Sequence, residues 1–129
     1  MENKCEGRKV LVAEDDVFLS NVYKSKLTKE GFEVFIAKNG EEAVEMATKN
    51  KPEIILLDLI MPIKNGFETL KELKESAETK DIKVVILSNL SQEEDEKKLL
   101  AMGAIGYVVK ANVSFREIIE LVKQHLGIE

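Results

Sequence analysis

The amino-acid sequence predicts a single domain of the α/β class, in which helices cover both faces of a parallel sheet. Five short apolar runs alternate with five stretches of helical periodicity along the 129 residues. The run from Ile54 to Leu57 is apolar at every position, which is typical of a strand covered on both faces. Strands that alternate with helices are joined by right-handed crossovers, and such crossovers place helices on both sides of a sheet.

The predicted strands and helices follow one another at short intervals. The apolar runs, which we interpret as strands, cover residues 10–13, 34–37, 54–57, 84–87 and 107–109. Apolar residues at helical spacing between the first two runs predict a helix, with Asp16 as its N-cap and Gly31 at its end. A second predicted helix follows Asn39 and Gly40, and a third follows Gly66.

The last two predicted helices begin with capping boxes. Ser91 with Glu94, and Ser114 with Glu117, have the spacing at which a hydroxyl and a carboxylate satisfy the first backbone N–H groups of a helix. The final helix then carries a strong apolar stripe between residues 115 and 126, which we interpret as a core face.

Five strands of this length predict the flavodoxin-like arrangement, a doubly wound five-stranded parallel sheet of order 2-1-3-4-5 with five helices. In that order the switch point lies between the first and third strands. Ligands of open α/β sheets bind in the crevice at the carboxyl ends of the strands next to this point. The residues that end the first and third strands are therefore expected to share one crevice.

The composition is that of an ordinary globular domain, with 44% apolar and 33% charged residues. We expect one domain over residues 1–129, in which residues 1–7 form a flexible N-terminus. Cys5 is the only cysteine, so the chain has neither a disulfide framework nor a cysteine metal cluster.

Charge and hydropathy argue against several classes of function. Residues 1–8 are polar and do not have the pattern of a signal peptide, and no apolar run approaches the length of a membrane span. We therefore expect a cytoplasmic protein without membrane contact. The net charge of −5, the scattered lysines and the few aromatic residues disfavour nucleic-acid binding, although a local basic patch formed by the fold stays open.

Acidic residues end the first and third predicted strands. Glu14, Asp15 and Asp16 follow the first strand, and Asp58 follows the third. Carboxylates that meet at one edge repel one another unless they are protonated or bridged by a cation, and oxygen ligands of this kind suit Mg²⁺. We interpret Asp16 as a helix cap. A solvated charge run, and for Asp58 a loop aspartate bonded to nearby backbone, are the alternatives.

Ser88 and Lys110 end the fourth and fifth strands, at the same edge of the predicted sheet. Taken separately, Ser88 could be a turn hydroxyl and Lys110 a surface lysine. Together with the acidic residues they form a site for a ligand with several anionic oxygens, which favours phosphoryl transfer. In that chemistry Asp58 is the nucleophile and forms an acyl phosphate, while Mg²⁺ and Lys110 neutralise charge on the equatorial oxygens.

Four segments carry a resemblance to a known family. LVAEDD, IILLDLIMPIKNG, VVILSNL and GYVVKA resemble motifs of the response-regulator receiver domain of two-component signalling, in the family's order and spacing. The resemblance extends over nearly the whole chain. It implies that Glu14 and Asp15 hold Mg²⁺ and that Asp58 is the phospho-acceptor. It also implies that Ile60 offers its backbone carbonyl to the metal.

The same resemblance implies roles for other residues and for partners. Ser88 would hydrogen-bond the phosphoryl group, and Lys110 would pair with it. Tyr107 matches an aromatic position whose ring turns inward when the site is phosphorylated. The implied donor is a histidine kinase or a histidine phosphotransfer protein. A downstream protein would bind the face built from the fourth helix, the fifth strand and the fifth helix.

Two positions depart from the family's usual pattern, and two others bear on the lifetime of the phosphoryl group. Ala111 follows Lys110 where the family usually has proline after a cis bond. A non-proline cis bond costs about 3–4 kcal/mol, so we expect a trans bond and a less assured reach of Lys110 toward the acceptor. Asn89 stands where the family usually has a small residue, and it is expected either to obstruct access to the site or to narrow the range of donors. In the family, the side chains two residues after the acceptor and two after the hydroxyl flank the line of water attack. Here they are Ile60 and Leu90, which cannot hydrogen-bond a water, and this predicts slow dephosphorylation.

Other functions share parts of this pattern. A hydrolase of the haloacid dehalogenase type needs a second acid two residues after the nucleophile, where this chain has Ile60. A flavin carrier would need a phosphate-cradling loop after the first strand, which the sequence lacks. The main alternative is a degenerate receiver that acts as an unphosphorylated interaction module, which Asn89 and Ala111 favour. We expect no output domain after the last helix, so a standalone receiver and an excised domain both stay open.

Overall fold

The computed structural model describes residues 3–89 and 92–128, and its sheet confirms the predicted strand order. The strands are β1 (Lys9–Ala13), β2 (Glu33–Ala37), β3 (Ile54–Asp58), β4 (Lys83–Ser88) and β5 (Gly106–Val109). Neighbouring strands pair in parallel in the order β2-β1-β3-β4-β5, so their carboxyl ends meet at one edge. We call this the carboxyl edge and the opposite one the amino edge.

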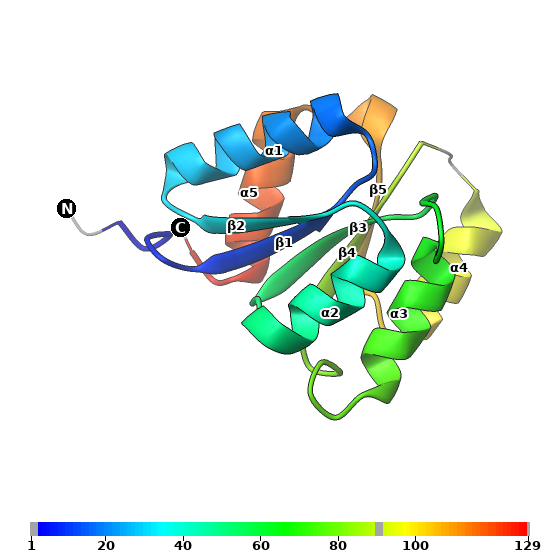
Figure 1. Ribbon diagram of the computed structural model, residues 1–129. Helices are drawn as coiled ribbons and strands as arrows, with labels where there is room; N and C mark the ends of the chain where they lie inside the picture. The colour runs from blue at the N-terminus through cyan, green and yellow to red at the C-terminus, as the bar shows by residue number, and fades with distance from the viewer. Residues whose placement is uncertain (1–2, 90–91, 129) are drawn as a thin grey trace.

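Helices cover both faces of the sheet, as predicted (Figure 1). They are α1 (Val17–Glu30), α2 (Gly40–Asn50), α3 (Gly66–Glu75), α4 (Glu93–Ala101) and α5 (Phe115–His125). Helices α1 and α5 lie on one face, and α2, α3 and α4 lie on the other. Side chains alternate along each strand, so Val12 and Leu56 enter the core beneath α1 and α5. Leu11 and Ile55 enter the second core, beneath α2, α3 and α4.

Local hydrogen bonds fix the starts and ends of the helices. Asp16 caps α1 as predicted, accepting a hydrogen bond from the backbone of Leu19 at 3.0 Å. Gly31 ends the same helix at φ 111°, in the left-handed region that favours glycine. The capping box predicted at Ser114 is present at the start of α5. The one predicted at Ser91 lies outside the described residues.

The segment before β1 folds back against the end of α1. The Asn3 side chain donates to the backbone carbonyl of Glu30 at 3.0 Å, and the backbone of Gly7 donates to that of Gly31 at 3.0 Å. Cys5 is buried in the core beneath α1 and α5, because its small apolar side chain fits between these helices and the sheet. The flexibility of residues 1–7 stays a prediction.

Candidate functional site

The carboxyl edge brings together the residues that the sequence places at the strand ends. Asp58 and Ser88 are the last residues of β3 and β4, and Lys110 follows β5. Ala13 of β1 pairs with Leu57 of β3, so the residues that follow them in the chain, Glu14 and Asp58, lie level with each other. The strand register therefore sets the acidic residues side by side.

Three carboxylates converge at this edge. Carboxylate oxygens of Glu14, Asp15 and Asp58 lie within 4.8 Å of one another. Glu14 and Asp58 are only 2% and 5% exposed, whereas Asp15 is open to solvent. An oxygen-only donor set with one open side fits Mg²⁺, which keeps several of its waters. Asp16 takes no part in this cluster, because its carboxylate caps α1.

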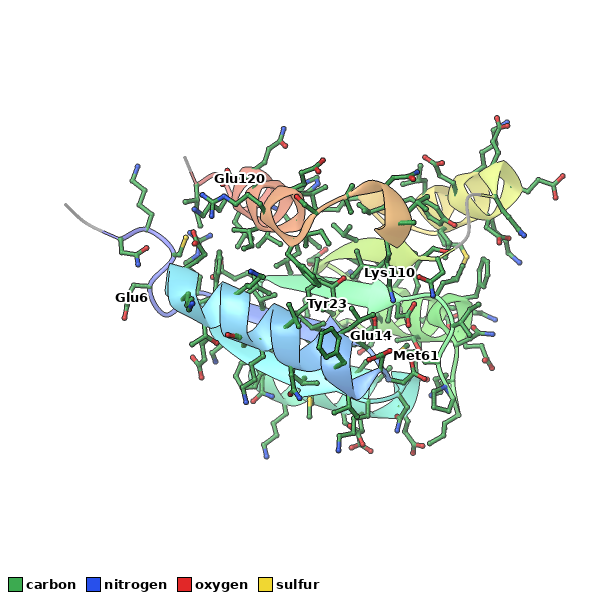
Figure 2. All side chains as sticks on the ribbon, turned by 90° about the horizontal axis from the view of Figure 1, so that it is seen from above. Glu6, Glu14, Tyr23, Met61, Lys110 and Glu120 are labelled. Carbon is green, nitrogen blue, oxygen red and sulfur yellow. The ribbon has the colours of Figure 1, made fainter. Side chains whose placement is uncertain are left out.

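Lys110 reaches into the acidic cluster and contacts two of its members. Its Nζ lies 2.5 Å from Oε1 of Glu14 and 3.3 Å from Oδ1 of Asp58, and its side chain is 10% exposed. Figure 2 shows Lys110 and Glu14 pointing toward each other from different elements. Three carboxylates and one ammonium sum to a formal charge of −2 (−3 + 1), which a divalent cation would balance.

The backbone around Lys110 differs in detail from the sequence prediction. Strand β5 ends at Val109, and Lys110 begins a short 3₁₀ helix, η1 (Lys110–Asn112), instead of ending the strand. The Lys110–Ala111 bond is trans, since the described residues contain no cis peptide bond. The expected trans bond is thus present, and Lys110 nevertheless contacts Asp58.

Burial and neighbouring charge make Asp58 a weaker acid than usual. Burial is the largest cause, and the hydrogen bond and charge of Glu14 add to it; Lys110 opposes them. The net result raises the pKa of Asp58 to about 7. Near neutral pH and without a bound cation, Asp58 is therefore protonated part of the time.

A pocket of about 320 Å³ leads to these groups. Its wall includes Ile60 and Asn89, in addition to the acidic residues and Lys110. Asn89 is thus at the position where the sequence predicts an obstruction. Ser88 is buried at the end of β4, and Leu90 lies outside the described residues. Tyr107 is half-buried in β5 and packs against the core beneath α2, α3 and α4.

The loop between β3 and α3 is held close to Asp58 by a glycine. A Cβ placed on Gly66 would lie 2.8 Å from the Cα of Leu59 and 2.9 Å from the carbonyl oxygen of Asp58. Only glycine therefore lets the start of α3 approach the acidic site this closely. The Gly66 backbone also donates to the carbonyl of Leu59 at 2.8 Å, which closes the loop.

Tyr23 of α1 is a neighbour of the site that sequence reasoning did not identify. Its ring packs edge-on against Phe115, with ring centroids 5.1 Å apart. Burial, and then the charges of Glu14 and Asp58, raise the pKa of Tyr23 to about 12. The helical spacing of the apolar residues gave no signal that Tyr23 lies near the acids.

None of the helices in the described part of the chain is both long enough and apolar enough to cross a membrane.

Comparison with known proteins gives one consistent family. The family model for the response regulator receiver domain matches residues 10–123. The receiver domain of Francisella response regulator 1452 is 30% identical, with 91% of this chain and 94% of that one covered and a TM-score of 0.81. The response regulator domain of Thermotoga maritima CheB is also 30% identical, with 96% and 99% covered and a TM-score of 0.80. A chain of the CheX–CheY–BeF3–Mg complex from Borrelia burgdorferi is 26% identical, with 98% of both chains covered and a TM-score of 0.87.

Proposed function

Because the chain belongs to the response regulator receiver domain family of two-component signalling, we propose that it is a switch that accepts a phosphoryl group on Asp58. The observation that carries the proposal is the position of this carboxylate. It is buried at the base of a pocket, beside two further carboxylates and 3.3 Å from the Nζ of Lys110. A structural aspartate would have no need of a second buried acid next to it.

In the proposed reaction an Oδ atom of Asp58 attacks the phosphorus of a phosphohistidine on a kinase or phosphotransfer protein. The new P–O bond forms as the P–N bond breaks, and the departing imidazole takes up a proton. The product is an acyl phosphate on Asp58. Lys110 pairs with the phosphoryl oxygens once it leaves Glu14, and the Ser88 hydroxyl donates a hydrogen bond to them.

Glu14, Asp15 and Asp58, with the carbonyl of Ile60, are the proposed ligands of Mg²⁺. Bound Mg²⁺ would supply positive charge to the phosphoryl oxygens and would favour the ionised form of Asp58. The role of the protein is to hold the acids within reach of one another, to bury Asp58 and to place Lys110 against both Asp58 and Glu14. In this family positioning and charge do most of the catalysis.

The proposed output surface is the face of α4, β5 and α5. Tyr107 lies on β5 of that face and is half-buried, and we propose that its ring turns inward on phosphorylation. Ser88 ends β4, and Lys110 directly follows β5, the strand that carries Tyr107, so these two residues connect the site to this face. Phosphorylation would shift a two-state equilibrium there and change affinity for a downstream protein.

Mass spectrometry after incubation with acetyl phosphate and Mg²⁺ tests the proposal. We expect the mass of the wild type to increase by one phosphoryl group. EDTA should abolish this increase, and the variants Asp58→Asn and Asp15→Asn should not show it. Asp16→Asn is the matched control, because asparagine preserves the cap of α1. It should be phosphorylated like the wild type. If the wild type gains no mass with acetyl phosphate or with any phosphohistidine donor, the chain is instead an unphosphorylated interaction module.

A further inference from the structure

A second cavity lies beside the Asp58 pocket, between α1 and the start of α5. Its volume is about 450 Å³, which is within the range of about 300–1,000 Å³ that is typical of small-molecule sites. Most of its wall consists of apolar and aromatic side chains, namely Leu19, Tyr23, Ala111, Val113, Phe115 and Ile118. We call this space the α1–α5 cavity.

The hydroxyl of Tyr23 opens into this cavity without a partner. Tyr23 is only 3% exposed, and its ring packs edge-on against Phe115. The hydroxyl forms no hydrogen bond with any of the described residues. In that part of the chain, no side-chain nitrogen or oxygen is both sealed from solvent and without a hydrogen bond. The Tyr23 hydroxyl must therefore reach open space, and the α1–α5 cavity is the space that Tyr23 lines.

Packing alone does not account for a tyrosine at this position. Phenylalanine would fill the same volume and make the same edge-on contact with Phe115, without a polar group to remove from water. The hydroxyl of a buried tyrosine usually has a hydrogen-bond partner. The unpaired hydroxyl of Tyr23 therefore indicates that a molecule bound in the cavity completes this hydrogen bond.

The charges around the hydroxyl limit the chemistry of that molecule. Burial, and then the charges of Glu14 and Asp58, raise the pKa of Tyr23 to about 12, so the hydroxyl stays protonated and can donate a hydrogen bond. The same negative charges oppose a carboxylate or another anion at this point. Lys110 lines the cavity as well, but its ammonium group is already paired with Glu14 and Asp58. A neutral acceptor such as a carbonyl group meets no such opposition.

We propose that the α1–α5 cavity binds a small, neutral and largely apolar molecule whose carbonyl group accepts a hydrogen bond from the Tyr23 hydroxyl. Lys110 lines both this cavity and the Asp58 pocket. A bound molecule would exclude water from the Lys110 side chain and strengthen its ion pairs with Glu14 and Asp58. Mg²⁺ would then compete less well for these acids. This link to the acceptor site rests on the proposed function, whereas the binding site itself does not.

Acetanilide is a suitable probe, because it is neutral and has an apolar ring with one carbonyl acceptor. Titration into isotope-labelled protein, followed by the amide resonances in NMR spectra, should show saturable binding with a dissociation constant of about 1 mM or below. The shifts should centre on residues 19–23 and 111–118. N-Ethylaniline has a similar shape without the carbonyl, and benzoate is an anion. Both should bind about fivefold more weakly than acetanilide.

Tyr23→Phe should weaken the binding of acetanilide about fivefold and leave that of N-ethylaniline unchanged, because it removes only the hydroxyl. Tyr107→Phe is the matched control, since it removes the hydroxyl of the other tyrosine, which packs against the core on the opposite face of the sheet. Ala111→Leu should weaken the binding of both molecules, because the larger side chain occupies part of the cavity. With acetanilide at saturation, calorimetric titration should show the midpoint for Mg²⁺ binding at least twofold higher.

Two results would overturn the site as proposed. One is the absence of saturable acetanilide binding to the wild type. The other is a Tyr23→Phe variant that binds acetanilide as tightly as the wild type, since water would then be the partner of the hydroxyl. Tighter binding of benzoate would refute the neutral class of ligand. Acetanilide binding that leaves the midpoint for Mg²⁺ unchanged would refute the link to the acceptor site. Failure of Asp58 to be phosphorylated, with acetanilide binding intact, would refute the proposed function and leave this binding site in place.

Discussion

The two edges of the sheet hold charged side chains in different ways. At the carboxyl edge several charged side chains are buried together, whereas at the amino edge they form pairs at the surface. At the carboxyl edge, Glu14, Asp58 and Lys110 share a site that is almost closed to solvent. Burial disfavours the charged form of each group, and one lysine cannot balance the acids. The loop there also contains the strained Ile63, whose φ of 68° is in the left-handed region. Each of these features lowers stability, and the buried charges are explained by the proposed binding of a cation and a phosphoryl group.

The amino edge has the opposite character. Arg8 donates from Nε to both carboxylate oxygens of Glu53, at 2.9 and 2.7 Å, and both side chains remain partly exposed. Lys9 donates to the backbone carbonyl of Asn50, and Lys83 to that of His125. These contacts tie strand starts to helix ends without burying a charge. The difference indicates that buried charge lowers stability at the edge where we propose that Asp58 is phosphorylated.

The largest expected effect is at Asp58. Asp58→Asn should abolish phosphorylation and yet stabilise the metal-free protein by about 1–3 kcal/mol at pH 8, because it removes a buried charge. The folded-state pKa of Asp58, about 7, is above its ordinary value, so its favourable contribution is complete at low pH and is lost as pH rises toward and through 7. Urea unfolding in EDTA at several pH values should show the variant's advantage vanishing near pH 4. A variant less stable than the wild type at pH 8 would contradict this account.

Removal of the Lys110 ammonium group should lower stability, the reverse of the effect expected for Asp58→Asn. Lys110→Ala leaves Glu14 and Asp58 without their shared partner and should cost about 3 kcal/mol in metal-free buffer, measured by urea unfolding. Adding Mg²⁺ should restore more stability to this variant than it adds to the wild type. Lys110→Arg is the control, since it keeps the charge. A loss below about 0.5 kcal/mol would mean that the pair resembles the surface pairs of the amino edge.

Gly66 tests how closely the acceptor loop must pack. In Gly66→Ala the new Cβ would meet the backbone of Asp58 and Leu59, which cannot move independently of the site. Overpacking of this kind costs about 1–3 kcal/mol. Thermal unfolding should show the loss, and the midpoint for Mg²⁺ binding should move to higher concentration, because the displaced segment carries Asp58 and Ile60. Gly7→Ala is a comparison at the amino edge, where a Cβ meets no atom within 4 Å and only the positive φ of 75° opposes it.

Sequence reasoning predicted which residues meet at the carboxyl edge but not the contacts that they make there. Asp58 and Ser88 could be placed at this edge because a buried strand has a recognisable apolar pattern and the carboxyl ends of parallel strands share one edge. The pairing of Lys110 with Glu14 was not found, since it depends on the turn that η1 makes after β5. The conformation of Ile63 was not found either, because a local sequence signal for a left-handed residue would have been glycine or asparagine.

The side chains expected to flank the path of an attacking water predict how long the phosphoryl group persists on Asp58. Ile60 lines the pocket and offers no hydrogen bond to an attacking water, so Ile60→Asn should speed dephosphorylation about tenfold, or about 1.4 kcal/mol in the barrier. Leu90→Glu is expected to act in the same direction, although Leu90 lies outside the described residues. Decay of the isolated phosphorylated proteins measures both rates. If neither variant accelerates decay, these side chains do not control the access of water.

The smallest expected effect is at the amino edge, and its pH dependence is opposite in sign to that of Asp58. The hydrogen bond from Arg8 is the main cause that holds the pKa of Glu53 below its ordinary value, against the opposing effect of burial. A lowered folded-state pKa means that the pair stabilises the protein above the ordinary pKa of glutamate, and that this contribution is lost as pH falls through the folded-state value. Both side chains are partly exposed, so Glu53→Gln should cost only about 0.5 kcal/mol at pH 7, with no loss at low pH. Urea unfolding of Asp58→Asn and Glu53→Gln across the same pH series should therefore give differences from the wild type that grow with pH but have opposite signs. If both variants changed the free energy of unfolding in the same direction, the two edges would not differ as described, with charges that lower stability at the carboxyl edge and charges that raise it at the amino edge.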